Sequence, residues 1–174
     1  MKNTLLPSVN FNIRVRDDSI QGDNPFKWVK KNTKDFFSQK KSILFSLPGA
    51  FTPTCSTFQL PDFNKLFDDF KNHGIDDIYC LSVNDSFVMN AWARHHDIGK
   101  VKVIPDGNGE FTRKMGMLVK KENLTFGMRS WRYAAIIDDC KVIESFIEEG
   151  YMDNANDDPY EKSSPQNILN YLKN

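Results

Sequence analysis

Residues 43–55 read ILFSLPGAFTPTC, and this stretch decides the fold class. Its apolar start, Ile43–Leu47, predicts a short buried strand. The following residues, 56–72, place apolar side chains three and four positions apart, which predicts a helix. Cys55 therefore stands on a strand-to-helix turn, where free backbone N–H groups and the positive end of the helix dipole stabilise a thiolate. Cys55 is the candidate nucleophile of this sequence.

Strand and helix patterns alternate on both sides of this stretch. Strands are predicted at residues 9–15, 78–83, 101–104, 131–137 and 141–147, and helices at 32–39, 87–92, 111–117 and from Pro165 onward. Pro61 falls inside the helix that follows Cys55 and should bend it. This order predicts a single α/β domain over residues 1–174, with a central mixed sheet flanked by helices.

Composition excludes several classes of function. The 23 basic and 23 acidic side chains cancel, so the chain lacks the positive charge that nucleic-acid binding requires. No apolar run reaches the roughly 18 residues of a membrane span, and we expect a cytoplasmic protein. Three cysteines, Cys55, Cys80 and Cys140, are too few for a disulfide scaffold and are not spaced as zinc ligands. We expect no metal and no bound cofactor.

The pattern Pro48-x-x-x-Thr52-x-x-Cys55 resembles the active-site motif of the peroxiredoxins, which are thiol peroxidases. The spelling PGAFTPTCS is similar to their type II branch, which includes the peroxiredoxin five group. Two further segments, SVNDSFVMNAW at residues 82–92 and PDGNGEFT at 105–112, also resemble that branch. The resemblance implies a thioredoxin-like fold, peroxide substrates and a homodimer.

The resemblance also assigns roles to residues near Cys55. The Cys55 thiolate attacks the O–O bond, while the Thr52 hydroxyl lies beside the sulfur and the peroxide. Pro48 excludes water without adding a competing N–H donor. The segment at residues 127–133 resembles the region that supplies a remote arginine, and this role falls to Arg132, whose guanidinium can donate to sulfur and oxygen together. Arg129 is the alternative and is expected to line the entrance.

The sequence leaves two possibilities for the step that regenerates the Cys55 thiol. The predicted strands at residues 131–137 and 141–147 form a hairpin. Some type II relatives carry a second cysteine after this hairpin, but residues 148–159 contain none. Cys80 lies on a predicted buried strand, and Cys140 has no matching family role. We therefore expect a one-cysteine cycle in which glutathione and a separate glutaredoxin reduce the Cys55 sulfenic acid. The alternative is a thioredoxin-dependent cycle with Cys80 as the resolving thiol.

Two other functions compete with a peroxidase. One is a cysteine hydrolase that uses His73, His95 or His96 as its base, and the other is a redox sensor without turnover. The Lys30-Lys31 and Lys40-Lys41 pairs are interpreted as solvated loop charge. Most of the 14 phenylalanines should be core, with a minority near the site forming an apolar dimer face.

Overall fold

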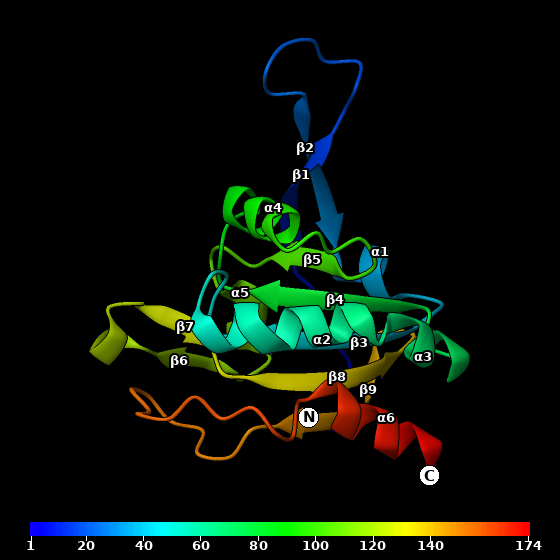
Figure 1. The fold of residues 1–174 in the computed structure, drawn as a ribbon, viewed down its shortest axis with the longest axis vertical. Helices are drawn as coiled ribbons and strands as arrows, with labels where there is room; N and C mark the ends of the chain where they lie inside the picture. Colours follow the sequence, from blue (N-terminus) through cyan, green and yellow to red (C-terminus); the bar gives the residue numbers. More distant parts are fainter.

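A five-stranded mixed sheet with strand order β5-β4-β3-β8-β9 forms the centre of the computed structural model, which describes residues 1–174 (Figure 1). Its strands are β3 (Lys41–Leu47), β4 (Asp77–Ser82), β5 (Lys102–Pro105), β8 (Tyr133–Asp138) and β9 (Lys141–Ile147). β3, β4 and β5 run parallel to one another, whereas β8 is antiparallel to both β3 and β9. The predicted mixed sheet and the thioredoxin-like fold are confirmed.

Each central strand sends alternate side chains to two separate apolar layers, as strand geometry requires. On β3, Ile43 and Phe45 enter one layer and Leu44 enters the other. The first layer is covered by α2 (Leu60–Lys65), α3 (Phe67–Asn72), α4 (Ser86–His95) and α6 (Pro165–Lys173). The second is covered by α1 (Thr33–Phe37) and α5 (Glu110–Lys114). Cys55 belongs to the first layer.

The helix predicted over residues 56–72 is in fact three consecutive pieces. It starts as a π-helical turn, η1 (Cys55–Gln59), and continues as α2 and α3 with a break at Leu66. Pro61 lies in the first turn of α2, where its missing N–H is tolerated. Because Pro61 cannot donate to the preceding turn, the irregularity lies before it, where the Leu60 N–H reaches back to the Cys55 carbonyl.

The strand predicted at residues 9–15 is confirmed as β1, but its pairing with β2 and a second antiparallel pair were not predicted from the sequence. β1 (Asn10–Arg16) and β2 (Phe26–Asn32) form a hairpin arm that projects from the body of the molecule (Figure 1). β6 (Leu118–Lys120) and β7 (Met128–Ser130) enclose the short helical turn η2 (Glu122–Leu124). β2 escaped prediction because its sequence, FKWVKKN, buries none of its side chains fully and does not alternate cleanly.

The interpretation of the lysine pairs as loop charge was wrong for Lys30, Lys31 and Lys41 and holds for Lys40, which lies in the bend before β3. Lys30 and Lys31 lie on β2. Lys41 opens β3, and Lys40 forms an ion pair with the partly buried Asp77 at 3.0 Å. No helix in the structure combines the length and the apolar character that a membrane span requires.

Candidate active site

Cys55 begins the π-helical turn that follows β3, and its side chain is fully buried. The first helical hydrogen bond runs from the Ser56 N–H to the Thr52 carbonyl at 3.0 Å. The N–H groups of Thr54 and Cys55 precede this bond and have no acceptor within the helix. The sulfur is therefore held next to free backbone donors, as the sequence predicted.

The loop before Cys55 is fixed by residues from the segment 82–92. Asn84 Oδ1 accepts the Ala50 N–H at 3.0 Å and the Ser82 hydroxyl at 2.7 Å. Phe51 adopts a left-handed backbone conformation with φ +63°, which a bulky residue rarely adopts without such support. Trp92 Nε1 donates to the Ser56 hydroxyl at 3.0 Å on the helical side. The tight turn before Cys55 is thus held from both ends.

Arg132 reaches this sulfur from the residue just before β8. Its side chain is 1% exposed, and Nη1 donates to Cys55 Sγ at 3.4 Å. Nη1 also donates to Gln59 Oε1, and Nη2 donates to Asp158. Burial alone would lower the pKa of Arg132, but the neighbouring Cys55 and Asp158 outweigh it and raise that pKa above its usual value. Arg132 is therefore a permanent buried cation beside the sulfur.

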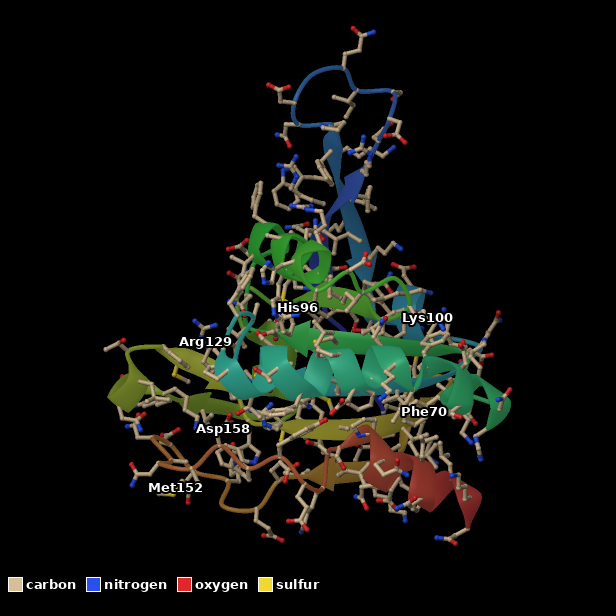
Figure 2. The ribbon with its side chains drawn as sticks, viewed as in Figure 1. Phe70, His96, Lys100, Arg129, Met152 and Asp158 are labelled. Atoms are coloured by element: carbon tan, nitrogen blue, oxygen red, sulfur yellow. The ribbon has the colours of Figure 1, made fainter.

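Three residues at this centre were missed by sequence reasoning. Gln59 follows Cys55 by four positions, and this helical spacing was a signal that could have identified it. Asp158 lies on the C-terminal loop at residues 149–164, which Figure 2 shows passing beneath the active-site helix. Its pairing with Arg132 spans 26 residues and leaves no sequence signal. Glu148 is the third residue, and it acts at the start of the same loop.

Glu148 ties the C-terminal loop down from the end of β9. Its buried carboxylate accepts the N–H groups of Glu161, Lys162 and Ser163. It also accepts the Ser163 hydroxyl at 2.7 Å. A carboxylate with four donors holds its segment rigidly, and this segment includes Asp158.

Pro48 and Thr52 line a pocket of about 350 Å³ together with Pro53 and Thr54, the two residues that lead into Cys55. Asp158, Lys121 and Phe126 contribute to its other walls. The Thr52 hydroxyl donates to the Gly49 carbonyl at 2.7 Å, so its oxygen remains available as an acceptor. The predicted positions of Pro48 and Thr52 beside an entering substrate fit this pocket.

Arg129 has a different place from Arg132. Its Nε donates to the Phe126 carbonyl at 3.0 Å and its Nη1 to the Val83 carbonyl at 3.1 Å. Its guanidinium also covers Gly49, where an added Cβ would lie 3.2 Å from Nη1. Burial lowers the pKa of Arg129. Arg129 braces the active-site loop against β7, whereas Arg132 is the residue that donates to the sulfur.

Of the remaining cysteines, Cys140 lies apart from this centre, whereas Cys80 lies close enough for Cys55 and Arg132 to shift the pKa of its thiol. Cys80 is fully buried on β4, opposite Phe45, and burial raises the pKa of its thiol well above the usual value. Cys140 lies in the turn between β8 and β9, and burial raises the pKa of its thiol as well. That turn lies beside the start of β3, about 20 Å along the strand from the Cys55 loop.

The histidines of the hydrolase hypothesis do not reach the sulfur. Arg132 is the side chain that hydrogen-bonds to Cys55, and no histidine does. His73 bonds to the Asp69 carbonyl at 2.8 Å, and the His95 ring packs against Phe51 at 5.8 Å. The structure therefore places a cation, and no base, beside the candidate nucleophile.

Comparison with known proteins agrees with this geometry. Residues 28–162 match the Redoxin family. A peroxiredoxin of Rhizobium etli is 65% identical over 168 residues, which cover 97% of this chain and 94% of that protein. The Plasmodium falciparum antioxidant protein, described as a 1-Cys peroxiredoxin, has a TM-score of 0.92 and 41% identity, covering 99% of each chain.

The reduced Prx3 of Vibrio vulnificus, solved in complex with hydrogen peroxide, has a TM-score of 0.83 and 31% identity, covering 99% of this chain and 98% of that one. The sequence resemblance is confirmed over nearly the full length. The Redoxin match spans most of the chain, and the similar proteins that cover nearly all of it are peroxiredoxins. The chain therefore belongs to the peroxiredoxins, the oxidoreductases of the Redoxin family that reduce peroxides.

Proposed function

We propose that this peroxiredoxin reduces hydrogen peroxide and organic hydroperoxides to water and alcohols through a sulfenic acid on Cys55. The observation that carries the proposal is the 3.4 Å contact between Arg132 Nη1 and the buried Cys55 sulfur. A cation held at this distance stabilises the thiolate before attack. It also stabilises the negative charge that moves onto oxygen as the O–O bond breaks.

The peroxide step follows from these contacts. The thiolate of Cys55 attacks one peroxide oxygen, an S–O bond forms, and the O–O bond breaks with its electron pair on the leaving oxygen. That oxygen takes a proton and departs as water or an alcohol. Arg132 and the free N–H groups at the start of η1 donate to the reacting oxygens, and the Thr52 oxygen accepts a hydrogen bond from the peroxide.

We further propose that glutathione, with a separate glutaredoxin, closes a one-cysteine cycle. A glutathione thiol attacks the sulfenic sulfur and releases water, and a second thiol then breaks the mixed disulfide to restore Cys55. The burial of Cys80 and the remote position of Cys140 support this cycle, as does the one-cysteine description of the Plasmodium neighbour. A glutathione-fed cycle also fits the expected cytoplasmic location.

Single cysteine substitutions test the cycle. In an NADPH-coupled assay with glutathione and glutaredoxin, Cys55→Ser should lose turnover, while Cys80→Ser and Cys140→Ser should keep it. Retained turnover in Cys55→Ser would reject the site. A redox sensor would oxidise once and then stop in the same assay.

The second candidate uses Cys80 as a resolving thiol with thioredoxin, because Cys80 shares an apolar layer with Cys55. It predicts faster turnover with thioredoxin than with glutaredoxin. It also predicts an internal disulfide that is absent from Cys80→Ser, which non-reducing mass spectrometry detects. Loss of turnover in a folded Cys80→Ser variant would favour this candidate.

We also propose a homodimer. Phe51 and Phe87 are 52% and 55% exposed and lie at opposite ends of α4, Phe51 against His95 and Phe87 against Trp28 of the arm, where apolar surface fits a second copy. Sedimentation should give a dimer for the wild type and a monomer for Phe87→Glu. Tyr171→Glu, at a 42% exposed position on α6, is the control and should remain dimeric. A monomeric wild type would contradict the proposal.

A further inference from the structure

Lys121 is a buried cation that the mechanism above does not use. It follows β6, and its side chain is only 3% exposed. Its Nζ lies 5.2 Å from the centre of the Trp131 ring. No carboxylate lies within 4.0 Å of this Nζ, and it donates no hydrogen bond within the chain.

The positive charge of Lys121 is unfavourable at a buried position without a counter-charge. Removing an ammonium from water without a counter-charge costs several kcal/mol, and a single aromatic face recovers on the order of 1–2 kcal/mol. The other buried cation of the site, Arg132, has three acceptors. Lys121 Nζ has no hydrogen-bond partner within the chain, but this atom is not completely enclosed and keeps some accessible surface.

This accessible surface faces the active-site pocket. Lys121 lines the same 350 Å³ space as Pro48, Thr52 and Asp158. Thr52 belongs to the loop that carries Cys55, and Asp158 is bound to Arg132. An anion at Lys121 would therefore belong to a molecule that lies against the loop carrying Cys55.

We propose that Lys121 binds a carboxylate of the molecule that enters this pocket and so sets its specificity. The proposal rests on the peroxidase function proposed above. A single ammonium matches one carboxylate, whereas the nearby Asp157 and Asp158 would repel a doubly charged phosphate. The carboxylate has two possible sources, the reducing thiol or the hydroperoxide, and both arrive at Cys55.

Paired reagents that differ only in this charge test the proposal. For the reductant, stopped-flow fluorescence compares glutathione with its glycine ethyl ester in reducing oxidised Cys55. For the oxidant, it compares linoleic acid hydroperoxide with its methyl ester. In the wild type, the ratio of acid to ester rate constants should be roughly ten in the half-reaction that supplies the carboxylate. Effects common to both reagents cancel in this ratio.

Lys121→Met keeps the length of the side chain and removes its charge, so the ratio should fall to about one. Lys121→Arg should restore it, and the exposed neighbour variant Lys120→Met should keep the wild-type ratio. Ratios near one in the wild type for both pairs, or an unchanged ratio in Lys121→Met, would overturn the proposal. The wild-type ratio decides the question even if Lys121→Met does not fold. Failure of wild-type Cys55 to react with hydrogen peroxide would instead reject the proposed function.

Discussion

The reaction of Cys55 with peroxide depends most directly on the guanidinium group of Arg132. It contacts the sulfur, Gln59 and Asp158 from a position with 1% exposure. Arg132→Met should lower the rate constant of Cys55 with hydrogen peroxide by about a hundredfold, because a charge aimed at the developing oxyanion is lost. Arg132→Lys should recover only a part, since an ammonium cannot donate to sulfur and oxygen in one plane.

Stopped-flow oxidation of the reduced protein measures both variants. Arg113→Met, at an exposed position on α5, is the control and should match the wild type. A wild-type rate in a folded Arg132→Met variant would show that the 3.4 Å contact has no part in catalysis.

Asp158 is the counter-charge that orients Arg132. Asp158→Ala should reduce peroxide reactivity several-fold, and Asp158→Asn should have a smaller effect because an amide oxygen still accepts from Nη2. Unfolding in urea should show a loss of about 2 kcal/mol for Asp158→Ala. This loss is less than for a fully buried pair, because the Asp158 side chain is 41% exposed. An Asp158→Asn variant identical to the wild type would indicate that the charge of the carboxylate has no part and that the side chain only fills space.

At the scale of elements, the C-terminal loop depends on one carboxylate. Glu148→Gln leaves N–H groups of residues 161–163 with weaker acceptors and should cost about 1–3 kcal/mol of unfolding free energy. Amide hydrogen exchange in residues 149–164 should become faster in Glu148→Gln than in the wild type, while exchange in the sheet should stay the same. Glu149→Gln is the matched control, because Glu149 is 81% exposed and pairs only with Lys162. Unchanged exchange in Glu148→Gln would refute the anchoring role.

The order of the parallel strands is supported by Asp77, which contacts Lys40, Lys102 and Tyr79. Burial would raise the pKa of Asp77, but hydrogen bonds from these three groups outweigh it and lower the pKa below the usual 3.8. A carboxyl group with a lowered folded-state pKa stabilises the fold above the unfolded pKa, and this contribution disappears as the pH falls through the folded value.

Asp77→Asn should therefore cost about 1 kcal/mol at pH 7, and the difference from wild type should vanish in strong acid. Urea unfolding at a series of pH values between 7 and 2 measures it. Asp68→Asn removes an exposed pair with Lys100 and should change little at any pH. A difference that persists undiminished at the lowest pH would exclude the carboxylate as the cause.

At the scale of the whole molecule, the sequence allowed prediction of the parts that have local signals. The sheet strands are apolar runs, and the nucleophile is marked by its neighbours in the chain, so both were found. β1 alternates and was predicted, but its partner β2, the break at Leu66 and the β6–β7 pair have no strong periodicity and were missed. Asp158 and Glu148 were also missed, because loop contacts between distant residues are decided by tertiary packing.

The full enclosure of the Cys55 side chain sets opposite demands on the two halves of the cycle. Hydrogen peroxide, the smallest oxidant, needs the residues around the sulfur to stay closed, because this enclosure keeps bulk water from competing for the hydrogen-bond donors. The tripeptide thiol of the proposed cycle is too bulky for the same space, so the surrounding residues must move apart before it reacts. Turnover under abundant peroxide would then be limited by how often the protein opens, a rate that viscosity and temperature govern more strongly than oxidant concentration.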